Sequence, residues 1–100
     1  MKNPVHPGEI IGHDVVAALG LSVTEVARRL GVSPTYLSRV ISGHSRVNAS
    51  LAYRLELAGV STGRFWLNLQ TAFDLATTIV DPATVEKLHS GNTDEVSDES

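Results

Sequence analysis

The chain has no cysteine, which excludes disulfides, a CxxC redox centre and a thiolate zinc site. A secreted scaffold of 100 residues usually needs such cross-links, so we expect a cytoplasmic protein. Aromatic residues make up only 5% of the chain, too few for a surface on which single-stranded nucleic acid could stack. No apolar run approaches the ~20 residues of a membrane-spanning helix. The N-terminal sequence MKNPVHPG also lacks an apolar signal core, so we expect no membrane association.

Positive charge is scarce overall, because 8 Lys and Arg stand against 11 Asp and Glu, a net charge of −3. This balance alone argues against contact with phosphates. The distribution changes that conclusion. Residues 1–80 carry seven basic and five acidic side chains, and residues 81–100 carry one basic and six acidic ones. The range 23–64 holds six arginines and only two carboxylates, so a DNA-binding domain is compatible with the charge.

Helix caps and stop signals divide the chain into five apolar helical segments and a tail. The predicted segments cover about 7–19, 23–30, 34–42, 49–58 and 64–80, with His6, Ser22, Ser33 and Ser61 as caps. No segment has the period-two alternation of a strand. We therefore predict an all-α, compact five-helix domain over residues 1–80, and a flexible acidic tail over 81–100. The predicted buried stripe of the first helix is Ile10, Ile11, Val15, Ala18 and Leu19.

Residues 23–42 have the pattern of a helix–turn–helix. Gly31 suits a turn residue with positive φ, and Ala27 is small where the second helix would cross closely. The positions that would face each other and the domain are all apolar: Val26, Leu30, Val32, Leu37 and Val40. An ordinary helical hairpin is the alternative, but the outer face of the second helix carries hydrogen-bonding side chains and no acid.

That outer face predicts contacts with the major groove of double-stranded DNA. The predicted base-reading residues are Pro34, Thr35, Tyr36, Ser38 and Arg39. Thr35 and Arg39 lead this set, because arginine can pair bidentately with guanine O6 and N7. The predicted phosphate contacts lie at the start of the first helix and in the loop after the second: Val23, Thr24, Ser42, His44 and Arg46. Arg28 and Arg29 either join them or form only the solvated face of their helix.

The fifth segment has more apolar residues than one buried face can use. We expect Phe65, Leu69, Ala72 and Ala76 to pack inward, which leaves Trp66, Phe73 and Val80 for a dimer or partner surface. A twofold homodimer would place two recognition helices ~34 Å apart, one turn of DNA. The alternatives are that the fourth helix and the tail cover these side chains, or that a different protein partner uses part of the surface.

Three motifs in this order resemble the HigA-type antitoxins, which are XRE-family (lambda-repressor-like) proteins: HPGEI at 6–10, the helix–turn–helix at 23–42, and FWLNLQ at 65–70. The resemblance covers about residues 5–80. It implies a homodimer that binds its own operator, represses its module and neutralises a HigB-like toxin, a RelE-like enzyme that cleaves mRNA on the ribosome. By motif, it assigns Thr35, Tyr36, Ser38 and Arg39 to the recognition helix. It assigns Ser42, His44 and Arg46 to the phosphate-contacting turn that follows.

Catalytic, metal and cofactor sites are not predicted. The four histidines, His6, His13, His44 and His89, lack HExxH or comparable ligand spacing, and the carboxylates nearest the predicted core lie on separate helices. Two other functions remain open. One is a stand-alone XRE-type repressor without a toxin, and the other is a toxin-sequestering interaction module with weak DNA binding.

Overall fold

In the computed structural model, which describes residues 4–89, all regular structure is helical. The first helix starts as α1 (Pro7–Ile10) and continues directly as η1 (Ile11–Ala17), a π-helix. It is followed by α2 (Val23–Leu30), α3 (Pro34–Ile41), α4 (Ala49–Leu57), α5 (Gly63–Thr77) and a short 3-10 turn, η2 (Pro82–Thr84). With α1 and η1 counted as one helix, the predicted all-α, five-helix helix–turn–helix fold is confirmed.

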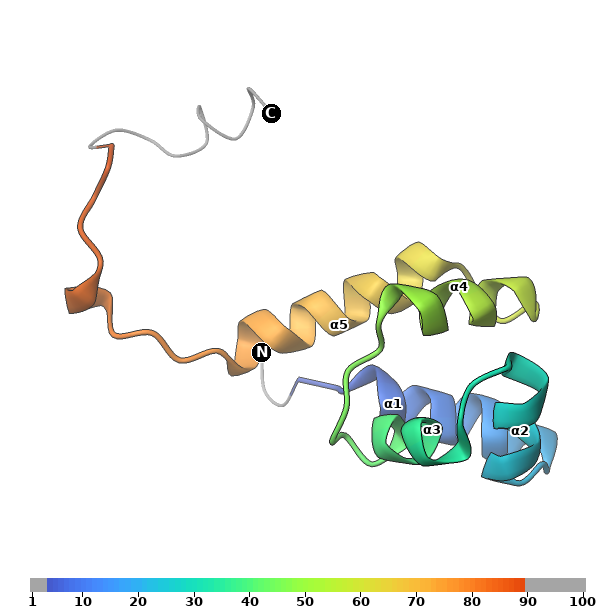
Figure 1. Ribbon diagram of the computed structural model, residues 1–100. Coiled ribbons are helices and arrows are strands. Elements are labelled where there is room, and N and C mark those ends of the chain that lie inside the picture. The colour runs from blue at the N-terminus through green and yellow to red at the C-terminus, as the bar shows by residue number, and fades with distance from the viewer. Residues whose placement is uncertain (1–3, 90–100) are drawn as a thin grey trace.

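The helices form a compact body in which α4 and α5 lie together above α1, α2 and α3 (Figure 1). Helix α1 contacts both α3 and α5, and so links the two layers. The core between them is apolar and made by all five helices together with Val47 of the loop before α4: Ile11, Val15, Val26, Ala27, Leu30, Leu37, Val40, Val47, Leu51, Ala52, Leu55 and Trp66. Within the described range 4–89, no helix is both long and apolar enough to span a membrane.

Side-chain caps begin the helices at positions that the sequence largely predicted. His6, Ser22 and Ser33 each accept a hydrogen bond from a backbone amide in the first turn of α1, α2 and α3. The prediction for α5 was wrong by one residue. Thr62 caps this helix, whereas Ser61 lies outside it in a left-handed conformation with φ 61°.

The buried face of the first helix also differs from the prediction. Ile11 and Val15 are buried, but Ala18 and Leu19 are exposed. The cause is the π-helical stretch. Its i→i+5 turns hold more residues than the 3.6 of an α-helix, so an apolar stripe extrapolated with the α-helical period drifts away from the core.

Two glycines are required by the geometry of the helix–turn–helix and its neighbour. Gly31 ends α2 in the left-handed conformation with φ 78°, as predicted. Gly8 lies where α1 crosses the backbone of α3, and a Cβ atom there would be 1.7 Å from the carbonyl oxygen of Val40. Helix α1 therefore rests directly on the C-terminal half of α3.

Helix α5 is rotated relative to the prediction. Trp66, expected on the surface, is only 2% exposed, and its Nε1–H donates to the carbonyl oxygen of Val60 at 2.9 Å. Phe73 is half-buried and meets the His6 ring edge-on, with centroids 4.8 Å apart. Conversely, Phe65, Ala72 and Ala76, expected inside, are exposed, and Leu69 is half-buried. The apolar side chains of α5 lie on all sides of the helix, so hydrophobicity alone could not identify its buried face.

The chain beyond α5 extends away from the body (Figure 1). Val80, which the sequence placed at the end of the fifth helix, lies after Thr77, where α5 ends, and is 59% exposed. Residues 81–89 are exposed. The rest of the predicted tail, residues 90–100, lies outside the described residues.

Candidate nucleic-acid interface

The start of α2 and the outer face of α3 together form a shallow hollow on the surface. Six residues line it: Val23, Thr24, Pro34, Thr35, Ser38 and Arg39. The sequence predicted two of these as phosphate contacts and four as base readers, so the fold brings members of both predicted sets to one surface. Both helices begin here, and their first-turn amides carry the positive end of the helix dipole.

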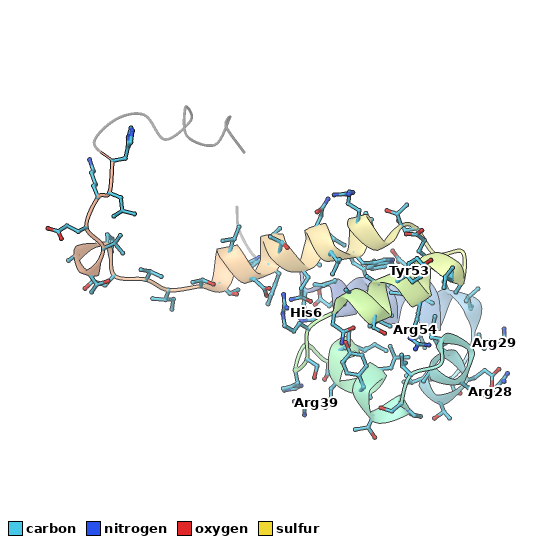
Figure 2. All side chains as sticks on the ribbon, turned by 45° about the horizontal axis from the view of Figure 1, so that its top comes forward. His6, Arg28, Arg29, Arg39, Tyr53 and Arg54 are labelled. Carbon is cyan, nitrogen blue, oxygen red and sulfur yellow. The ribbon has the colours of Figure 1, made fainter. Side chains whose placement is uncertain are left out.

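Buried contacts on the opposite side fix the orientation of α3. Leu37 and Val40 are fully buried, whereas Thr35, Ser38 and Arg39 are exposed. This alternation follows the helical period. The burial of Leu37 and Val40 therefore also determines which face of α3 is exposed and could enter a groove. Arg39 extends outward from the body in Figure 2, as do Arg28 and Arg29 at the other end of the helix–turn–helix.

Arg39 also binds the loop that follows its own helix. Its Nε–H donates to Ser45 Oγ at 3.1 Å, and its Nη2 donates to the carbonyl oxygen of His44 at 3.2 Å. Ser42 Oγ lies 2.8 Å from His44 Nδ1. These bonds hold Arg39 against the predicted phosphate-contacting loop. Reading a guanine with the same nitrogens would therefore require exchanging bonds to the loop for bonds to the base.

Tyr36 does not share the outward orientation of its neighbours on α3. Its hydroxyl donates to the carbonyl oxygen of Arg46 at 2.8 Å, and lies 3.4 Å from the amide nitrogen of Asn48. The side chain is half-buried and packs against the core. Its hydroxyl therefore holds the loop in the free protein, and we leave Tyr36 out of the proposed base-reading set.

Arg46, a predicted phosphate contact, forms an ion pair with Asp74 of α5. The other oxygen of Asp74 accepts from Gln70 Nε2 at 2.9 Å. The hydrogen bond from Gln70, together with Arg46, lowers the pKa of Asp74 below its usual value. The predicted base and phosphate contacts did not include Gln70 or Asp74, although Gln70 is the last residue of the FWLNLQ motif. Both lie on the face of α5 that was expected to point away from the core, and their i, i+4 spacing was the available signal.

Arg28 and Arg29 are paired within α2. Arg28 Nη2 and Arg29 Nε approach Glu25 Oε2 at 2.6 and 2.7 Å. The bonds from Arg28 and then Arg29 lower the pKa of Glu25 to about 2, so this carboxylate keeps its charge and its two pairs down to acidic pH. The pairing supports the interpretation of these arginines as a solvated helix face that offsets its own charge.

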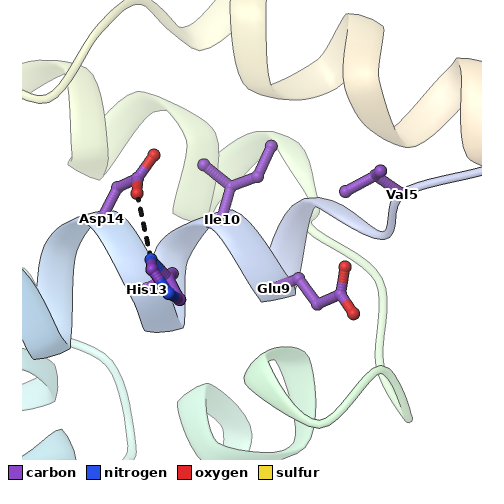
Figure 3. Close-up of a pocket in the computed structure, with 5 residues that line it drawn as sticks. All are labelled: Val5, Glu9, Ile10, His13 and Asp14. Atoms are coloured by element: carbon purple, nitrogen blue, oxygen red, sulfur yellow. Dashed lines mark ion pairs between the residues drawn. The ribbon is translucent and has the colours of Figure 1, made fainter.

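A second shallow hollow lies along the first helix (Figure 3). Val5, Glu9, Ile10, His13 and Asp14 line it, and His13 Nδ1 lies 3.6 Å from Asp14 Oδ1. Both side chains of this pair are largely exposed. Within residues 4–89, no group of three or more His, Cys, Asp or Glu side chains is arranged to hold a metal ion.

Comparisons with known proteins agree with this geometry. The helix-turn-helix family HTH_3 matches residues 15–58. Virulence-associated protein A' of Dichelobacter nodosus is 40% identical over 77 residues, which are 76% of this chain and 66% of that protein. The chain thus spans slightly less than two thirds of this relative's length.

Solved structures share the fold over most of the chain. The antitoxin GraA is 40% identical with a TM-score of 0.73, covering 77% of this chain and 83% of GraA. The antitoxin HigA of Pseudomonas aeruginosa, solved with the higBA promoter, is 32% identical with a TM-score of 0.72, covering 75% of this chain and 82% of that one. With its helix–turn–helix and these relatives, the chain belongs to the HigA-like antitoxins, DNA-binding regulators of the XRE helix–turn–helix family.

Proposed function

We propose that this chain is the antitoxin of a type II toxin–antitoxin module. In this proposal it binds its own operator DNA as a homodimer, represses transcription of the module and neutralises a HigB-like toxin. The chain itself would do no catalysis and would need no cofactor.

The observation that carries operator binding is the hollow shared by α2 and α3. Thr35, Ser38 and Arg39 give it exposed donors and acceptors, and no acidic side chain lines it. Thr35 and Arg39 would read base edges, and Pro34 would offer only apolar contact, for example to a thymine methyl group. Phosphates would be contacted at two places. One is the first-turn amides of α2, at Val23 and Thr24, and the other is the segment after α3, at Ser42, His44 and Arg46.

Three arginine substitutions test this assignment by fluorescence anisotropy on the DNA upstream of the gene. Arg39→Ala should cost about 1–3 kcal/mol and relax the preference at one base pair. Arg46→Ala should weaken binding to all sequences evenly. Arg64→Ala on α5 removes the same charge outside the helix–turn–helix and is the matched control. Equal losses in all three variants would mean that net charge, and not this face, binds DNA.

The exposed apolar residues of α5 support a homodimer surface at a different place from the one predicted by the sequence. Trp66 is buried, so it cannot belong to this surface. Phe65, Ala72, Leu75 and Ala76 are exposed along α5, and Val80 is exposed beyond its end. Leu75→Lys should convert the dimer to a monomer in sedimentation equilibrium while the helical content is kept. A Leu75→Lys variant that remains dimeric would rule out this face of α5 as the interface.

Toxin binding is best tested by co-expression with the product of the adjacent reading frame. A short basic protein that co-purifies with the chain, and whose toxicity the chain relieves, would support the antitoxin role. If no such frame exists and operator binding is intact, the function is that of a stand-alone repressor. If Arg39→Ala leaves repression unchanged while toxin binding persists, the chain acts only by sequestering the toxin.

A further inference from the structure

Gln70 of α5 is a polar side chain in the domain core. Burying its amide group costs free energy unless both the oxygen and the nitrogen form hydrogen bonds. It is only 2% exposed. Its Oε1 accepts from the amide N–H of Val47 at 2.7 Å, and its Nε2 donates to Asp74 Oδ1 at 2.9 Å. A carboxylate can only accept, so Asp74 fixes which end of the amide faces Val47.

Gln70 and Asp74, which are bonded to each other, bind two consecutive residues of the loop after α3. Asp74 holds the side chain of Arg46 with its second oxygen, and Gln70 holds the backbone of Val47. The side chain of Val47 is 1% exposed, so it anchors the same stretch in the core. An apolar residue at position 70 would fill the core but could not accept the hydrogen bond from the amide of Val47. The use of glutamine therefore points to the loop as its purpose.

Tyr36 holds the same loop from the other side. Its hydroxyl donates to the carbonyl oxygen of Arg46, the residue next to the one that Gln70 binds. The loop is thus bonded to α3 through Tyr36 and to α5 through Gln70. Its carbonyl at His44 in turn accepts a hydrogen bond from Arg39, which Arg39 would give up in order to read a guanine, so the loop does not orient Arg39 in the complex with DNA.

We propose that Gln70 and Tyr36 are positioning residues for DNA binding: they clamp the loop of residues 44–48 so that its phosphate-contacting groups are set before DNA arrives. Neither residue touches the DNA in this proposal. Both act through the loop, so their removal should weaken phosphate contacts by the loop, and with them binding to all DNA sequences evenly, and leave the base preference in place. The inference rests on the proposed operator binding.

The test compares DNA binding by four full-length proteins: the wild type, Gln70→Met, Tyr36→Phe and Trp66→Phe. Each is measured on the same two duplexes, the DNA upstream of the gene and a scrambled sequence. Methionine keeps the volume of Gln70 and removes both of its hydrogen bonds. Trp66→Phe is the matched control, because it also removes a hydrogen bond of a buried α5 side chain, but one whose partner is Val60 and not the loop of residues 44–48. Circular dichroism sets a temperature at which all variants are folded.

We expect Gln70→Met and Tyr36→Phe to weaken binding to both duplexes by the same factor. The slope of log K against log salt should fall in magnitude by about 0.9 for each phosphate that a variant no longer neutralises. Trp66→Phe should bind as the wild type does. If Gln70→Met does not fold, Tyr36→Phe decides the result.

The proposal is overturned if the two clamp variants keep the wild-type affinity and salt slope, or if Trp66→Phe weakens binding as much as they do. It is also overturned if Tyr36→Phe changes the preference for one base pair, because that would make Tyr36 a base reader. If the wild type itself does not bind the operator, the proposed function fails. If the wild type binds and the clamp variants bind equally well, only this inference fails.

Discussion

Substitution of Gly8 by alanine should destabilise the domain through the contact between α1 and α3. A Cβ at this position would lie 1.7 Å from the carbonyl oxygen of Val40, whereas real Cβ contacts stay beyond 3.0 Å. The obstacle is backbone, so α1 and the recognition helix must move apart. Overpacking of this kind costs about 1–3 kcal/mol, occasionally more. In a domain of this size, each kcal/mol lowers Tm by roughly 4–8 °C.

Gly12→Ala is the matched control for this prediction. It makes the same substitution one turn later in the same helix, and its Cβ would meet the Cγ2 atom of Ile41 at 2.9 Å. That atom is a side-chain methyl group, but it branches from Cβ of Ile41, and rotation about χ1 of isoleucine is restricted in a helix, so part of the clash remains. The overlap is much smaller than at Gly8, and the helix preference of alanine over glycine, about 1 kcal/mol, offsets part of its cost. We expect Gly12→Ala to melt much closer to the wild type than Gly8→Ala in circular dichroism. Equal Tm values for the two variants would refute the close contact at Gly8.

Three further predictions follow from single contacts. Trp66→Phe should lower the free energy of unfolding by about 1–3 kcal/mol in urea denaturation, because the carbonyl oxygen of Val60 loses its partner. Stability should fall as the pH drops below 6.5, because burial lowers the pKa of His6 and the folded state therefore favours its neutral ring. His6→Asn keeps an acceptor for the amide of Gly8, so it should lose this pH dependence between pH 7.5 and 5.5; an unchanged dependence would exclude His6 as its source. At concentrations low enough for the wild type to be monomeric, Leu75→Asp should leave the Tm unchanged, because the side chain is 73% exposed; a large decrease there would mean that Leu75 is part of the fold.

The sequence predicted the helix–turn–helix well because its signals are local. Ser22 and Ser33 cap α2 and α3, and Gly31 takes the left-handed conformation that ends α2. Each of these positions depends on the backbone within a few residues. The predicted burial of Leu37 and Val40 follows from the helical period once the caps are known.

The rotation of α5 could not be predicted in the same way. Its apolar residues lie on all sides of the helix, and its buried face carries two polar groups whose partners lie outside the helix. Gln70 binds Val47 of the loop before α4, and Trp66 binds Val60 of the loop before α5. Hydrophobicity gives no reason to bury Gln70, whereas its two hydrogen bonds satisfy its amide in the core. The exposure of Leu19 has a different cause, the π-helical turns of η1, which change the period on which the prediction relied.

The candidate site shows the same division between local and distant signals. The outward direction of Thr35, Ser38 and Arg39 follows from the period of α3. The inward role of Tyr36 depends on the path of the loop over residues 44–48, and the pairing of Arg46 depends on Asp74, 28 residues away. Neither could be read from spacing within the helix–turn–helix.

The most direct test of operator recognition measures the binding of the wild-type chain to its own upstream DNA and to a scrambled duplex of equal composition, at salt concentrations from about 50 to 200 mM. We predict that log K falls linearly with log salt on both duplexes, with a slope of about −0.9 for each phosphate neutralised. The upstream DNA should bind more tightly at every salt concentration. Binding that is independent of salt and equal on both duplexes would contradict the proposal that this helix–turn–helix recognises an operator.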